Sequence, residues 1–170
     1  MNAVDVLYWG DDFAPRGRTL KDVPQSEWDT PDVCGWWSVK HIIAHLASFE
    51  LVLIDVLNGF LGGGPTPYLD KYLNQHPAFN DEQVARRKDN SPADVLVEYD
   101  EAQARARSLA AQIPGETLRQ PDARRLAWYG AQYSLDDLIV YQYYGHKREH
   151  CAQINVFKDT LKTKGVIRES

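Results

Sequence analysis

Apolar residues recur every three or four positions after Ser38, which is the spacing of one face of an α-helix. The run opens with a serine, a common helix N-cap, and stops at the sequence Gly62-Gly63-Gly64-Pro65. This pattern predicts a long helix over residues 38–61 that carries a histidine on its apolar face. The inward-facing positions are Ile42, His45, Phe49, Val52, Val56 and Phe60.

A second helix is marked by residues 91–94. Ser91, Pro92 and Asp94 supply an N-cap, a first-turn proline and an acidic third residue in the expected order. Pro114 and the glycine after it stop the helix. The apolar face consists of Val95, Leu96, Tyr99, Ala102, Ala106, Leu109 and Ile113.

The last long helix begins at Ser134, where Asp137 three residues later completes a capping box. Basic residues and Gly165 close it. Its inward-facing positions include polar side chains as well as apolar ones. They are Leu135, Ile139, Gln142, His146, His150, Gln153, Phe157 and Leu161.

The rest of the chain gives weaker signals. Residues 4–23 hold apolar side chains at helical spacing, but a glycine and Pro15 should kink or split this first helix. The segments 62–90 and 114–133 are rich in glycine, proline and polar residues and are expected to connect the helices. A short extra helix is predicted at Asn80–Gln83.

These elements predict an all-α fold. Alternation of apolar and polar residues, the pattern of a strand, does not occur in the sequence. With 170 residues, 44% of them hydrophobic, the chain fits one domain, residues 1–170, with a single core. Three or four long amphipathic helices indicate a four-helix bundle, in which metal sites are commonly built from side chains on facing helices.

Composition excludes several classes of function. The net charge is −5 and basic residues are interspersed with acidic ones, so nucleic-acid binding is not expected. The start of the chain lacks the pattern of a secretory signal, and the longest apolar stretch, 46–61, is interrupted by two acidic residues and an asparagine. We therefore expect a cytoplasmic protein without membrane contact. Cys34 and Cys151 form no metal or redox motif and are expected to be free thiols.

Four of the five histidines lie in two His-x-x-x-His spacings, His41/His45 and His146/His150. Random placement would give roughly 0.15 such pairs in a chain of this composition, so the clustering needs a cause. Residues four apart lie one above the other on a helix, and two imidazoles there can turn toward one ion. The sequence therefore indicates a metal.

Three of these histidines lie on the central apolar faces: His45, His146 and His150. Three imidazoles can hold a zinc-like ion and leave a fourth position for water or substrate. Such a site keeps the full charge of the ion, which acidifies a bound water or thiol. His41 is offset by roughly 40° around the helix axis, so it could support the ligands, act as a fourth ligand or lie at the surface.

Other polar residues near the histidines have two interpretations each. Glu149 completes an H-x-x-E-H sequence, a protease signature in which the glutamate is the general base. About 100° of helix rotation separates it from His150, however, and favours a solvated charged face that it shares with Lys147 and Arg148. Gln142 and Gln153 could orient the ligands, or bond to one another or to buried water. Cys151 is better explained by core packing than by nucleophilic catalysis.

Three segments carry a family resemblance, WSVKHIIAHLASFE, SPADVLVEYDEA and YSLDDLIVYQYYGHKREHCAQI. With them the sequence resembles the DinB/YfiT-like superfamily of metal-binding four-helix bundles over nearly its whole length. The segment FNDEQVARRKDNSPADVL is also similar to the mycothiol-dependent isomerase branch, without a counterpart of that branch's C-terminal domain. The resemblance implies that His45, His146 and His150 bind a divalent ion, zinc or nickel, and that the protein transfers a low-molecular-weight thiol or performs a hydrolysis.

Three functional classes follow. The first is a metal-dependent enzyme acting on a small molecule, either a transferase that uses a low-molecular-weight thiol as co-substrate or a hydrolase. The second is a non-catalytic protein that binds or sequesters a small molecule or toxin. The third is an interaction module in which the histidines belong to the core and hold no metal. A homodimer is compatible with the sequence.

Overall fold

The computed structural model describes Asp5 and residues 19–168, and the described residues form helices and connecting turns with no strand. This confirms the all-α fold class. The predicted helix over residues 4–23 falls mostly outside the described residues, and its end, residues 19–22, is a turn. The elements are η1 (Gln25–Glu27), α2 (Val39–Phe60), α3 (Pro67–Gln75), α4 (Phe79–Ala85), α5 (Pro92–Ala110), α6 (Gly115–Arg119), α7 (Leu135–Leu138), η2 (Ile139–Gly145) and α8 (His146–Thr163).

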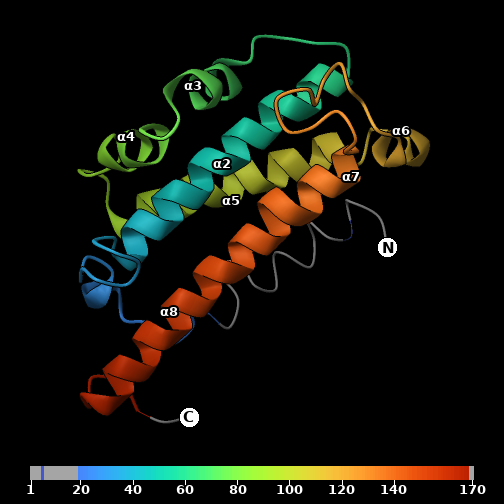
Figure 1. The fold of residues 1–170 in the computed structure, drawn as a ribbon. Coiled ribbons are helices and arrows are strands. Elements are labelled where there is room, and N and C mark those ends of the chain that lie inside the picture. The colour runs from blue at the N-terminus through green and yellow to red at the C-terminus, as the bar shows by residue number, and fades with distance from the viewer. Residues whose placement is uncertain (1–4, 6–18, 169–170) are drawn as a thin grey trace.

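Three long helical segments make up the body of the molecule (Figure 1). They are α2, α5 and the continuous run of α7, η2 and α8, called here the last long helix. α2 packs along α5 and also contacts α8, while α3 and α4 cover its outer flank. α2 is therefore the central element of the bundle, in contact with every layer around it.

The three long segments begin where the sequence predicts. Each N-cap serine accepts a hydrogen bond from the backbone N–H three residues later, and the side chain of that third residue accepts one from the serine N–H. The end of α2 is also as predicted, because Gly62 has the positive φ of +116° that the turn requires. The three pairs are Ser38 with His41, Ser91 with Asp94 and Ser134 with Asp137.

The sequence pattern predicts an α-helix along the whole of the last long helix, but the structure departs from α-helical winding in one segment. Residues Ile139–Gly145 form a π-helix, in which hydrogen bonds close at i→i+5 and the chain winds more loosely. The π-helix ends immediately before His146, the first residue of α8. The facing of both histidines in α8 therefore depends on this local change of winding.

Residues 62–90 are more ordered than predicted. The short helix expected at Asn80–Gln83 is confirmed within α4, but α3 was not predicted. α3 is held against α2 by Asp55, whose Oδ2 accepts hydrogen bonds from the backbone N–H groups of Tyr68 (2.7 Å) and Leu69 (3.1 Å). Asp55 thus caps a helix from a neighbouring element, the task a local N-cap residue usually performs.

The buried side chains form two apolar clusters, one at each end of the bundle. One joins the C-terminal halves of α2 and α5 to α6, α7 and η2, and the other joins their N-terminal halves to residues 20–37 and α8. Between the clusters, α2 and the last long helix place a layer of buried polar side chains. Its members are His45, Glu50, Lys147 and His150.

α2 is long and apolar enough to cross a membrane. Most of its residues, however, are buried against the other helices of the bundle. This is the environment of a core helix in a water-soluble protein.

Candidate metal centre

Two facing helices bring three imidazoles together. His45 projects from the middle of α2, and His146 and His150 occupy successive turns of α8. The Nε2 atom of His146 lies 2.9 Å from Nε2 of His45 and 2.9 Å from Nε2 of His150. Among the described residues, these three histidines form the group whose ligand atoms converge as a metal site requires.

The hydrogen bonding of His150 shows which nitrogen faces the cluster. Its Nδ1 donates to Oε1 of Gln153 at 2.8 Å, because an amide oxygen can only accept. The ring proton is then on Nδ1, and the lone pair of Nε2 points toward the other two rings. This is the arrangement that orients a metal-binding histidine, and it favours the ligand-orienting interpretation of Gln153.

The spacing of the three nitrogens fits a small divalent cation. Two nitrogens bound at the usual zinc distance in tetrahedral geometry stand roughly 3.3 Å apart, close to the 2.9 Å of the two Nε2 pairs. Without a cation or extra protons, converging lone pairs repel one another. The donor set, all neutral imidazole, suits zinc and nickel alike.

Burial keeps the imidazoles neutral. Burial first, and the charges of neighbouring imidazoles second, lower the pKa of His45 to about 2 and that of His146 to about 3. The pKa of His150 is also lowered by burial, against the opposing effect of its hydrogen bond to Gln153. At neutral pH each ring is in the uncharged form that binds metals.

Aromatic side chains pack around the cluster. The rings of Trp37 and Phe49 each lie 4.8 Å from the ring of His45, measured between centroids, and Phe49 lies at the same distance from His146. The Nδ1 atoms of His45 and His146 are buried and have no hydrogen-bond partner among the described residues. Packing, rather than an outer hydrogen bond, therefore sets the orientation of these two rings.

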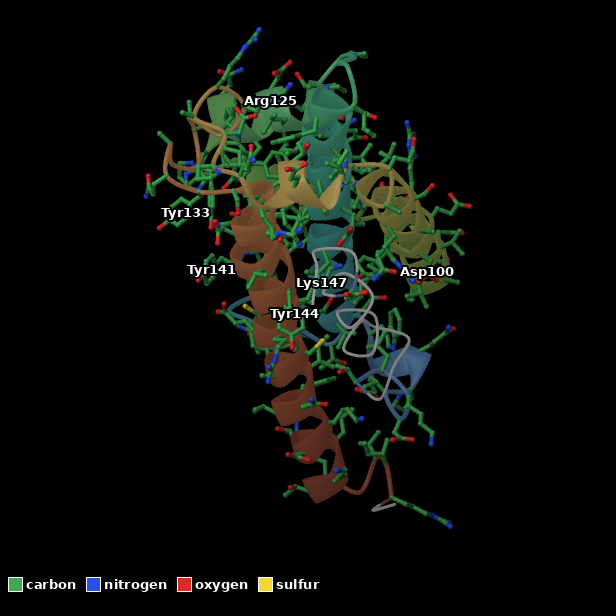
Figure 2. All side chains as sticks on the ribbon, turned by 90° about the vertical axis from the view of Figure 1, so that its right-hand side faces the viewer. Asp100, Arg125, Tyr133, Tyr141, Tyr144 and Lys147 are labelled. Carbon is green, nitrogen blue, oxygen red and sulfur yellow. The ribbon has the colours of Figure 1, made fainter. Side chains whose placement is uncertain are left out.

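A buried ion pair lies beside the cluster and was not predicted. Lys147 is 2% exposed and pairs with Glu50, which is 0% exposed, whereas the sequence placed Lys147 on a solvated charged face (Figure 2). Burial alone would lower the pKa of Lys147, but the charge of Glu50 and hydrogen bonds to Glu50 and Tyr99 outweigh it and raise the pKa. The sequence signal was weak because the partner lies about a hundred positions away.

Other candidate residues lie apart from the three nitrogens. His41 caps α2 through its Nδ1, which accepts from the N–H of Ser38 at 3.2 Å, and its ring packs on Trp36. Glu149 is exposed on α8 and is not part of the convergent group. Cys151 is buried, and burial raises the pKa of its thiol, as expected for a core cysteine.

A cavity of about 400 Å³ is lined by none of the three histidines, and the ring of Phe49 lies between its wall residue Tyr72 and His146. Gln142, one helical turn before His146, is part of its wall and hydrogen-bonds Tyr129. The ring of Tyr72 lies 5.6 Å from Phe49, the same ring that contacts the histidines. The cavity is lined by Tyr72, Leu73, His76, Trp128, Tyr129 and Gln142. Most of these belong to segments where the sequence predicted only connections.

An all-α bundle in which two buried imidazoles and one half-buried imidazole converge fits a metal-binding helical protein. The chain matches the family model of the DinB superfamily over residues 17–154, and it belongs to this superfamily. The resemblance deduced from the sequence motifs is thereby confirmed. Neither the curated proteins nor the solved structures provide a match.

Proposed function

We propose that this protein is a metal-dependent enzyme that acts on a small molecule, with His45, His146 and His150 holding one divalent ion, zinc or nickel. The observation that carries the proposal is the convergence of three Nε2 atoms while Gln153 fixes the tautomer of His150. Three ligands leave an open position for a substrate atom. The two free cysteines support a cytoplasmic location as part of the same proposal.

Of the two chemistries, transfer of a low-molecular-weight thiol has the better support. The buried carboxylate of Glu50 is paired with Lys147, Glu149 is exposed, and among the described residues no carboxylate belongs to the convergent group, so neither glutamate is proposed as a general base. A divalent ion lowers the pKa of a thiol or water bound to it and so removes the need for such a base. Thiols gain most, because they are already acidic near pH 8.5.

The remaining residues have separate tasks in this proposal. Gln153 holds His150 in the ligating tautomer, and Trp37 and Phe49 exclude water from two sides of the cluster. The cavity beside Gln142 receives the substrate. Low polarity around the site strengthens every electrostatic interaction within it.

Elemental analysis tests the metal site. Untagged protein, purified without chelating resin and reconstituted with zinc or nickel, should retain about one equivalent. His146→Ala should lose most of the metal, whereas the matched control His41→Ala should keep it, because His41 caps a helix instead of joining the cluster. Retention below about a tenth of an equivalent at micromolar protein would refute the site.

Cobalt substitution separates the two chemistries. A thiol that enters the open position should add a sulfur-to-metal charge-transfer band to the spectrum, whereas a hydrolase should give rates that rise with pH through about 7. We expect the band with at least one of bacillithiol, mycothiol, glutathione and cysteine. An unchanged spectrum with all four at millimolar concentration rules out the transferase.

A non-catalytic binding protein is the second candidate. It is supported by the same lack of a well-placed general base among the described residues. This candidate takes precedence if the thiols leave the spectrum of the cobalt-substituted protein unchanged and the protein hydrolyses neither esters nor amides.

A further inference from the structure

The cavity that Gln142 and Tyr72 line has an unusual wall. Four of its six lining side chains are aromatic, and none of the described residues that line it is lysine or arginine. The aromatic residues come from two separate parts of the chain. Tyr72 belongs to α3 and His76 is the C-cap of that helix, whereas Trp128 and Tyr129 belong to the connection before α7. Two segments far apart in sequence thus contribute rings to one small space.

These rings cross one another instead of stacking. The ring of Tyr72 is inclined by 84° to that of His76 and by 77° to that of Trp128, with centroids 5.8 Å and 6.0 Å apart. Trp128 and Tyr129 meet at 57° with centroids 5.9 Å apart. Parallel rings would form a slot for a flat ligand, whereas crossed rings form corners that suit a compact, rounded group.

Crossed aromatic rings attract a positive charge. The π-face of tyrosine and tryptophan carries negative electrostatic potential, and a cation is attracted within about 6 Å of a ring centroid. Because neighbouring centroids here are 6.0 Å apart or less, one group can lie in that range of two or three rings at once. The net charge of −5 adds a negative long-range potential, which also attracts a cation.

We infer that this cavity binds a methylated organic ammonium group as the recognition element of the substrate. The inference rests on the proposed function in one respect, because it assigns the cavity to the substrate of the three-histidine site. Phe49 connects the two, since its ring lies 4.8 Å from His146 and 5.6 Å from Tyr72. The ammonium group is thus held one ring away from the histidines, and the reacting part of the substrate extends toward them.

Calorimetric titration with choline and with 3,3-dimethyl-1-butanol tests the inference. The two compounds have nearly the same shape and both carry a hydroxyl, but only choline is charged. We expect choline to bind at least about fivefold more tightly, the lower range of a partly desolvated cation–π site. Equal or tighter binding of the neutral compound, or no saturable binding of either at 50 mM, roughly the weak limit of such sites, overturns the inference.

Variants locate the site. Tyr72→Leu should weaken choline binding at least fivefold while Tyr72→Phe keeps it, because the second variant retains the ring. Trp128→Leu is an independent test on another element. Tyr141→Leu is the matched control, since Tyr141 is 61% exposed on the last long helix and points away from the bundle (Figure 2). Similar loss in the Tyr141→Leu and Tyr72→Leu variants would place binding elsewhere and contradict the proposal.

Metal content is measured on the same samples, with and without chelator. Choline binding needs the aromatic wall and not the ion, so it should persist after chelation. Failure of choline binding with one equivalent of metal retained refutes this inference alone. Choline binding without metal retention refutes the metal site alone.

Discussion

Replacement of Lys147 by methionine should destabilise the protein strongly. The carboxylate of Glu50 is 0% exposed and would remain in the interior without its partner. Breaking a buried ion pair by removing one member costs about 3–5 kcal/mol, because the remaining charge keeps its desolvation penalty. For a chain of this size, that loss corresponds to a fall in Tm of about 6–20 °C.

The double variant Glu50→Met/Lys147→Met should recover most of this loss. With both charges removed, the desolvation cost disappears, and methionine fills a similar volume on each side. We expect its free energy of unfolding to lie within about 1 kcal/mol of the natural protein or above it. The strong coupling would appear as a large interaction energy in the double-mutant cycle.

The assay is urea unfolding at pH 7 on metal-free protein, so that metal binding at the neighbouring His146 does not contribute. Lys162→Met is the matched control, since Lys162 forms an exposed pair with Asp159 on the same helix, and its loss should cost less than about 1 kcal/mol. A loss below about 1 kcal/mol for Lys147→Met would refute the reasoning. The reasoning would also be refuted if the double variant lost as much stability as the single variants Glu50→Met and Lys147→Met lose together.

Three further predictions follow from the same structure. Asp55→Ala should cost about 1 kcal/mol and speed amide hydrogen exchange in α3, because the cap of that helix is lost; unchanged exchange would contradict this. The metal-free protein should lose stability as the pH falls below about 6.5, by up to about 1.4 kcal/mol per pH unit for each histidine. The reason is that these histidines are protonated in the unfolded chain from about pH 6.5, whereas His45 and His146 stay neutral in the folded protein down to about pH 3. Acid titration by circular dichroism would show a flat response if the imidazoles were not buried. A thiol reagent should modify half-buried Cys34 in the native protein and Cys151 only after unfolding, as peptide mass analysis would reveal.

The helix boundaries could be predicted because their signals are local. Ser38, Ser91 and Ser134 each cap a helix with the third residue after them, a geometry that a few neighbouring residues define without help from the rest of the fold. His45, His146 and His150 could be predicted as a group because helical periodicity places all three on inward faces. The structure brings those three together.

The missed features depend on partners remote in sequence. Lys147 can be buried because Glu50 on another helix pairs with it, and no residue adjacent to Lys147 in the sequence indicates this partner. α3 was missed because its cap, Asp55, lies in α2, while the local N-cap residue Thr66 makes no side-chain capping bond. The aromatic cavity was missed because Tyr72 and Trp128 meet only after two connections fold onto α2.

The π-helix contains more residues per turn than an α-helix and can therefore tolerate a change in chain length. Residues 139–145 are wound more loosely than an α-helix, so they could lose one residue, tighten into α-helical winding and leave the elements on either side facing as before. The stretch between His146 and His150 has no such tolerance, because one residue fewer there turns the second imidazole by about 100° away from the first. Natural variation in length is therefore expected to collect in the turn before the ligand pair, while the four-residue spacing of the pair itself stays fixed.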